Sequence, residues 1–196
     1  ISEEDRAEMR RGFAQGEEYF VFVGSLNPRK NLKRMVEAFA KFKEATESKT
    51  KLLIVGEAMW QSELDLGLDV VLKLGQDLGF TGHLTLGELT RVVGGAKAMV
   101  FPSYFEGFGI PLVEAMKAGC PIVSSNKTSL PEVAGDAATY FDPFSVDEIM
   151  EAMIKIDQSN ELRTSLIEKG LERSKQFSWD FTAQKIWDVL QQFSKK

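Results

Sequence analysis

Apolar residues gather in short runs, and between these runs they recur at helical spacing. Residues 19–23 form a continuous apolar run, too short for a helix and rich in aromatic and β-branched residues, which predicts a buried central strand. Strands that alternate with helices through short connections predict an α/β fold: a doubly wound, parallel, Rossmann-like sheet with helices on both faces. The other predicted strands are residues 51–55, 79–82, 98–101, 121–124 and 138–141.

Residues that favour helix starts precede several of the helical stretches. Thr85 and Ser145 are each followed three residues later by a glutamate, which predicts a capping box at both positions. Asn31 and Asn160 are expected to cap two further helices. Residues 59–76 also read as helical, although two glycines interrupt the pattern.

The composition is that of one ordinary globular domain. The chain has 196 residues, of which 43% are hydrophobic and 27% charged, enough for one well-buried core and short for two. A net charge of −5 argues against nucleic acid or an anionic membrane as the main partner. The single cysteine, Cys120, excludes an internal disulfide and suits a reducing, cytoplasmic compartment, and the single histidine, His83, argues against a zinc site.

The most informative stretch is E-G-F-G-I-P-L-V-E-A-M-K-A-G, residues 106–119. Two glutamates, Glu106 and Glu114, flank a turn that Gly107 and Gly109 make accessible. Pro111 has the fixed φ that suits the first turn of a helix. We therefore expect the strand over 98–101 to be followed by a glycine loop and a helix of about two turns.

The loop of this stretch is a candidate anion site. The first backbone amides of the helix, around Phe108, Gly109 and Ile110, point back into the loop, where they can bind phosphate. Glu106 and Glu114 then stand on either side, each able to accept hydrogen bonds from a hydroxyl-bearing part of the ligand. Nucleotide sugars have that shape. The alternative is a tight strand-to-helix turn with two solvated glutamates.

A second candidate site follows the first strand. Gly24 and Ser25 end that strand, and Arg29 and Lys30 come just before the next helix. Open α/β sheets bind ligands at the carboxyl edge where such loops lie, so the two cations are placed for a diphosphate. A dehydrogenase-like dinucleotide site would need further glycines beside Gly24, and the chain has none there.

These segments resemble the retaining glycosyltransferases of family 4 (group 1), which have the GT-B fold. The resemblance lies in E-x7-E within E-G-F-G-x-P-L-V-E-A-M, in F-V-G-S-L-N-P-R-K-N-L, in F-P-S-Y and in G-C-P-I-V-S-S-N-K-T-S-L-P-E-V-A-G-D-A-A. It covers most of residues 19–182, in order and at family spacing. One departure is Ser25, where many members have arginine directly after the glycine.

The resemblance implies roles for these residues. Arg29 and Lys30 would bind the diphosphate, Glu106 the hydroxyls of the donor sugar and Glu114 the ribose. The loop Gly82-His83-Leu84 is expected near the base. No cofactor and no metal are expected, because the chain has no Asp-x-Asp. The partner would be a nucleotide sugar such as GDP-mannose or a UDP-hexose, not a nucleic acid.

The resemblance also implies a domain plan. Residues 1–16 are expected to be a polar tail or a linker from an absent acceptor domain, and residues 17–178 the donor-binding, C-terminal half of a GT-B enzyme. A short helix is predicted over 128–134 within it. Residues 179–196 form an amphipathic helix, for which two arrangements stay open: packing on its own sheet, or crossing to the missing domain.

The function implied is transfer of a hexose, with mannose as one candidate, to a glycan or lipid-linked acceptor in cell-envelope polysaccharide biosynthesis. Membrane contact would occur only through the missing domain, at the inner face of the membrane. The isolated domain should be inactive. The alternatives are a non-catalytic nucleotide-sugar binding module, or half of a GT-B epimerase or phosphorylase.

Overall fold

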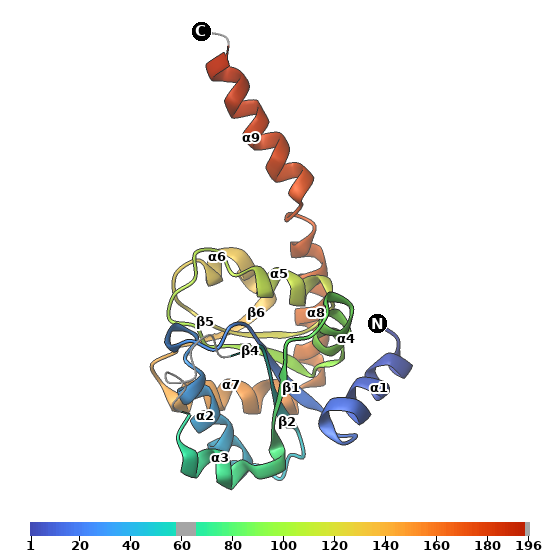
Figure 1. The fold of residues 1–196 in the computed structure, drawn as a ribbon, viewed down its shortest axis with the longest axis vertical. Helices are drawn as coiled ribbons and strands as arrows, with labels where there is room; N and C mark the ends of the chain where they lie inside the picture. The colour runs from blue at the N-terminus through green and yellow to red at the C-terminus, as the bar shows by residue number, and fades with distance from the viewer. Residues whose placement is uncertain (58–65, 195–196) are drawn as a thin grey trace.

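The structure is a computed structural model that describes residues 1–57 and 66–194 (Figure 1). It contains a six-stranded sheet with the order β3-β2-β1-β4-β5-β6, in which every neighbouring pair is parallel. The predicted doubly wound parallel sheet is confirmed. The strands are β1 (Tyr19–Val23), β2 (Lys51–Val55), β3 (Leu78–Gly82), β4 (Ala98–Phe101), β5 (Ile122–Ser125) and β6 (Ala138–Phe141).

Helices cover both faces of the sheet (Figure 1). One layer contains α2 (Leu32–Ala45), α3 (Leu68–Leu74) and α7 (Val146–Gln158). The opposite layer contains α1 (Glu3–Ala14), α4 (Leu86–Gly95), α5 (Ile110–Lys117) and α8 (Asn160–Ser174), with the short α6 (Leu130–Ala134) beside α5. Three single turns of 3-10 helix are η1 (Pro28–Lys30), η2 (Gly75–Asp77) and η3 (Gly135–Ala137).

The core lies on both sides of β1. All five residues of this strand are buried, as expected for a central parallel strand covered by helices on both faces. The Phe20 ring meets Phe39 and Phe42 of α2 edge-on, with ring centroids 6.5 and 5.5 Å away. Burying one such side chain stabilises the fold by about 1.5–3 kcal/mol.

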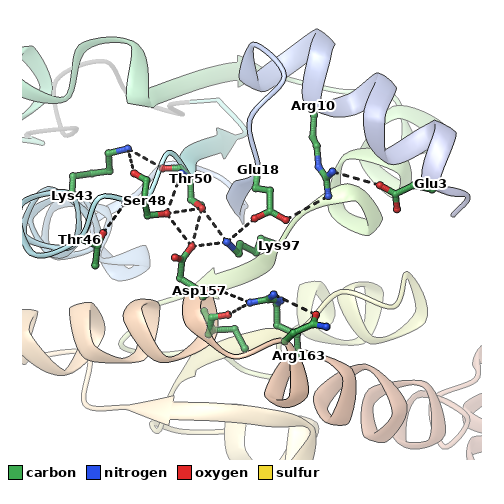
Figure 2. A network of polar contacts seen from close by, with 12 residues as sticks. Glu3, Arg10, Glu18, Lys43, Thr46, Ser48, Thr50, Lys97, Asp157 and Arg163 are labelled. Carbon is green, nitrogen blue, oxygen red and sulfur yellow. Dashed lines mark hydrogen bonds and ion pairs between the residues drawn. The ribbon is translucent and has the colours of Figure 1, made fainter.

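A polar network ties the elements together at the amino edge of the sheet, opposite the carboxyl ends of the strands (Figure 2). Lys97, just before β4, places its Nζ 2.7 Å from Asp157 of α7 and 2.6 Å from Glu18 before β1. Thr50 donates a hydrogen bond to the same Asp157 oxygen. The side chains of Lys97 and Asp157 are only 8% and 11% exposed, so this pair is part of the buried structure.

Two capping predictions have different outcomes. Thr85 forms the full capping box with Glu88, as predicted. Ser145 accepts a hydrogen bond from the backbone of Glu148, but the Glu148 carboxylate accepts from the amide of Asp142 instead of returning to Ser145. The second capping box is therefore only half formed.

The two predicted asparagine caps have different outcomes. Asn31 stands at the N-cap position of α2 as predicted, but it is left-handed with φ of 58° and its side chain makes no cap bond. Its side-chain Nδ2 donates to the carbonyls of Pro102 and Pro143, and these long-range partners hold the side chain away from the cap geometry. In α8, the cap is Ser159, which accepts from the amide of Leu162, and Asn160 is the first helical residue.

Two helix predictions were only partly met. The predicted helix over 59–76 falls partly on residues outside the described part, and its described portion forms α3 and η2. The helix predicted over 128–134 begins two residues late, at Leu130, because Thr128 is in a left-handed conformation.

The two ends of the chain differ in how they pack. Residues 1–16 form α1, which buries Met9 and Ala14 against the domain and contacts α4. That they also link to a preceding domain stays a prediction.

The last helix, α9 (Trp179–Ser194), extends away from the sheet (Figure 1). Its apolar stripe is exposed rather than packed on the sheet, so the first of the two predicted arrangements is wrong. The exposed side chains include Trp179, Phe181, Ile186, Trp187, Leu190 and Phe193. Among the described residues, no helix has both the length and the apolar character that a membrane span requires.

Candidate functional site

The strand order places the candidate site between β1 and β4. These strands are neighbours, but the chain leaves β1 towards α2 on one face of the sheet and leaves β4 towards α5 on the other. The loops that follow the two strands therefore diverge at the carboxyl edge, which is where open α/β sheets bind ligands; the region between these loops is here termed the crevice. The first loop carries Arg29 and Lys30, and the second carries Glu106.

Three charged side chains from these two loops meet in the crevice. Lys30 Nζ lies 2.7 Å from Glu106 Oε1, and Arg29 Nη1 lies 2.9 Å from Glu106 Oε2. Arg29 also donates a hydrogen bond to the carbonyl of Phe105. Lys30 and Glu106 are 4% and 8% exposed, whereas about half of the Arg29 side chain is accessible. The two cations and the first glutamate thus form one cluster, although they were assigned separate roles from the sequence.

The charge state of Glu106 follows from its partners. Burial raises the pKa of this carboxyl, but hydrogen bonds from Lys30 and Arg29 lower it by more, so the pKa lies below its usual value. Glu106 is therefore ionised at neutral pH and serves as the counterion of both cations.

Close backbone approach makes room for Lys30. A Cβ on Gly24 would stand 3.3 Å from Lys30 Cε, so a side chain at this position would crowd the lysine. A Cβ on Gly56 would stand only 2.0 Å from the carbonyl oxygen of Gly24. The ends of β1 and β2 can approach this closely only because residue 56 is glycine. In the sequence, Gly56 only follows the predicted strand over 51–55, and this position alone did not indicate that it shapes the site.

The glycine loop forms the other wall. Gly109 is left-handed with φ of 100° and stands at the N-cap position of α5. Within the described part of the chain, no acceptor is found for the amides of Phe108, Gly109 and Ile110. These amides and the positive end of the α5 dipole are available to an anion, as expected.

Glu114 is separate from the charged cluster. It lies on α5 and is more exposed than Glu106, and among the described residues its carboxylate has no ion-pair or hydrogen-bond partner. Partial burial raises the pKa of its carboxyl above the usual value. The two glutamates of the motif therefore differ in environment: one is paired and held, the other is unpaired.

The remaining predicted residues lie on the same sheet edge without contacting the cluster. Gly82 ends β3 with a left-handed φ of 67°, and His83 after it is exposed. Ser25 Oγ accepts a hydrogen bond from the side chain of Asn27, 3.0 Å away. Because β2 lies between β3 and β1, the Gly82-His83-Leu84 loop is well placed to contact the far end of an extended ligand.

A cavity of about 660 Å³ adjoins the glycine loop on the side of α6 and the start of α9. Its lining includes Phe108, Ser129, Arg173, Phe177 and Phe181. It includes neither the charged cluster nor Glu114, so we place the candidate site in the crevice rather than in this cavity. Among the described residues, no group of three His, Cys, Asp or Glu side chains is arranged to hold a metal ion.

Sequence comparison agrees with this geometry. A family model described as glycosyl transferases group 1 matches residues 3–173. The chain is 34% identical over 165 residues to O-antigen chain mannosyltransferase B of Escherichia coli, an alignment that covers 83% of this chain and 42% of that protein. The chain spans less than half of the length of the curated relatives it matches.

Solved structures share the fold. Anabaena HepE in complex with UDP superposes with a TM-score of 0.84 at 18% identity, covering 98% of this chain and 54% of that one. The C-terminal domain of the group 1 glycosyl transferase LpcC from Francisella tularensis gives a TM-score of 0.74 at 19% identity, covering 87% of this chain and 91% of that domain. At these identities the likeness concerns the fold alone.

Proposed function

Because the chain belongs to the group 1 glycosyl transferases, we propose that it is the donor-binding, C-terminal half of a retaining GT-B hexosyltransferase. The observation that carries the proposal is the meeting of Arg29, Lys30 and Glu106 in the crevice between β1 and β4, beside the free amides that start α5. This combination provides cations and dipoles for a diphosphate and a carboxylate for a hydroxyl.

The cations and the amides would stabilise the leaving group. When the bond between sugar and phosphate breaks, negative charge grows on the phosphate, and preorganised positive groups lower the barrier. Without ligand, Glu106 forms ion pairs with both Arg29 and Lys30 and offsets one of their two positive charges. A diphosphate that reaches the loop amides would share these cations, which frees the Glu106 oxygens to accept hydrogen bonds from a sugar hydroxyl.

The two glutamates would then act on opposite flanks of the diphosphate. Glu106, before the loop, meets the sugar, and Glu114, one turn into α5, meets the ribose. The base would lie towards Gly82, His83 and Leu84, two strands away. Ionised Glu106 is a pure acceptor, which suits a hydroxyl donor.

The relatives support two kinds of donor. The O-antigen chain mannosyltransferase relative supports a mannose donor, for which we propose GDP-mannose, and a glycan acceptor in cell-envelope polysaccharide synthesis. The complexes of HepE with UDP and UDP-glucose support a UDP-hexose. We propose one of these donors, bound without a metal ion, in a cytoplasmic enzyme.

An acceptor-binding domain would complete the active site. The chain spans less than half of its curated relatives, which supports a further domain in the whole protein. The exposed apolar stripe of α9 would contact that domain, and any membrane contact would be made there. The chain alone should bind the donor without transferring sugar. Steady transfer to a glycan by these 196 residues would contradict this division of labour.

A thermal-shift screen tests the proposal. UDP, GDP and their hexose derivatives are each titrated against the chain, with the Arg29→Ala/Lys30→Met double variant as control. A nucleotide at about 100 times its Kd should stabilise the chain by about 2.7 kcal/mol, and the control should lose most of this gain. No shift with any of these nucleotides would overturn the proposed function.

A further inference from the structure

Thr128 adopts a backbone conformation that its side chain disfavours. Its φ is +53°, and in the described part of the chain only Gln15 and Asn31 are other non-glycine residues with positive φ. For a β-branched residue this region is a true outlier, because the branched Cβ crowds the backbone. Such a strained residue persists only where surrounding contacts hold it, and strain of this kind gathers at functional sites.

Thr128 and the two residues after it contact the glycine loop one after another. The Glu106 amide donates to Thr128 Oγ1 at 3.1 Å. The hydroxyl of Ser129 lies 2.9 Å from the carbonyl oxygens of both Glu106 and Phe108, and its proton is shared between them. Leu130 then packs under Gly109, where an added Cβ would stand 2.8 Å from Leu130 Cδ2.

We propose that residues 128–130, here termed the loop clamp, position Glu106 for the donor sugar. The inference rests on the proposed function. The clamp holds the Glu106 backbone on both sides, with the amide bound by Thr128 and the carbonyl by Ser129. Thr128 and Ser129 are positioning residues, because they act through Glu106.

The clamp matters most once the donor has bound. Without ligand, the Glu106 carboxylate is also held by Lys30 at 2.7 Å and Arg29 at 2.9 Å. A diphosphate that shares these cations weakens this support, and the backbone bonds to the clamp are then what keeps the carboxylate in place. A hydrogen-bond acceptor that is already held in position contributes more to binding than a mobile one, because the mobile group must be ordered when the ligand binds.

The choice of residue fits this role. Glycine would adopt the left-handed conformation without strain, but it has no oxygen to accept the Glu106 amide. Serine and threonine have the hydroxyl, and both keep it on Cβ. A requirement for the hydroxyl therefore explains why a strained residue is present where an unstrained glycine would serve the backbone better.

The test compares Thr128→Gly with the conservative Thr128→Ser. The first readout needs no ligand: hydrogen exchange of the Glu106 amide should become about tenfold faster or more in Thr128→Gly, and stay within about twofold of wild type in Thr128→Ser. The second is calorimetry with UDP and GDP and with their hexose derivatives. Thr128→Gly should reduce the additional affinity due to the sugar by about fivefold or more, while affinity for the bare diphosphate changes by less than about twofold.

The outcomes separate the clamp from the proposed function. Unchanged exchange of the Glu106 amide in Thr128→Gly, or an unchanged sugar contribution while the wild type binds its donor, overturns the clamp and leaves the proposed function standing. Loss of the sugar contribution in Thr128→Ser as well as in Thr128→Gly also overturns it, because the hydroxyl is then not what matters. If the wild type binds no nucleotide sugar, the proposed function fails, and the sugar-positioning role fails with it.

Discussion

Replacing Glu106 with glutamine removes the negative charge that forms ion pairs with Lys30 and Arg29. The loss of this charge affects the two cations differently. About half of the Arg29 side chain is exposed to water, which can solvate its charge, whereas only 6% of the Lys30 side chain is exposed. Breaking a buried ion pair by removing one partner costs about 3–5 kcal/mol, because a charge is left buried without compensation. Since only Lys30 is left as a buried charge without a partner, we expect the unfolding free energy to fall by about 3 kcal/mol, the lower end of this range.

Urea denaturation of the chain at pH 7 measures this loss directly. Thermal unfolding provides a second measurement. In a chain of this size each kcal/mol shifts the midpoint by about 2–4 °C, so the midpoint should fall by roughly 6–12 °C. Glu114→Gln is the matched control. Its carboxylate is exposed and has no partner among the described residues, so its unfolding free energy should stay within about 0.5 kcal/mol of wild type.

The effect should depend on pH in a defined direction. The folded-state pKa of Glu106 is lowered from the ordinary value of 4.5, so its stabilisation is fully present above that value. The stabilisation is lost as the pH falls through the folded-state pKa, and the wild type should then approach Glu106→Gln. A loss of less than about 1 kcal/mol at pH 7, or a difference that grows as the pH falls, would refute a buried counterion at Glu106.

Two further predictions concern the buried lysines Lys30 and Lys97. Lys30→Met should weaken the binding of UDP or GDP by about 1.5–3 kcal/mol in calorimetry, the worth of a charge-assisted hydrogen bond, and unchanged affinity for both would remove the basic loop from the site. Lys97→Met leaves Asp157 buried without its cation and should lower the unfolding free energy by about 3 kcal/mol, whereas Lys41→Met, which removes an exposed ion pair with Asp147, should have a much smaller effect. Equal losses in these two variants would show that the network at the amino edge is no more stabilising than a surface pair.

Much of the sheet could be predicted because four of its six strands, β1, β2, β4 and β5, are buried along their whole length. β1, β2, β4 and β6 begin and end where the apolar runs do. The edge strand β3 was predicted one residue short, and only its first residue, Leu78, is buried. The internal strand β5 was predicted one residue early, at 121–124, whereas the other edge strand, β6, was predicted with its observed bounds. Local apolar pattern therefore places the strands to within one residue, whether they are internal or at an edge.

What could not be predicted depends on partners far away in the sequence. Glu106 and Lys30 are 76 residues apart, and only the strand order brings them within hydrogen-bond distance. Asn31 is a residue type that favours N-cap positions, but its side-chain amide donates hydrogen bonds to carbonyls 71 and 112 residues away. Thr128 adopts a conformation against its own preference, so no propensity could have indicated it. The sequence therefore indicated Arg29, Lys30 and Glu106 as candidates without revealing that they contact one another.

The division of labour between the two glutamates can be measured by calorimetry of Glu114→Gln and Glu106→Gln against a nucleoside diphosphate and the same nucleotide carrying its sugar. Glu114→Gln should weaken both ligands alike, by about 1–3 kcal/mol. Glu106→Gln should not weaken the bare diphosphate, because Arg29 and Lys30 lose a competing anion, and it should lose about 1–3 kcal/mol of the additional affinity that the sugar contributes. If Glu106→Gln weakens the bare diphosphate more than Glu114→Gln does, or if neither change alters binding, the donor is not held in this crevice as proposed.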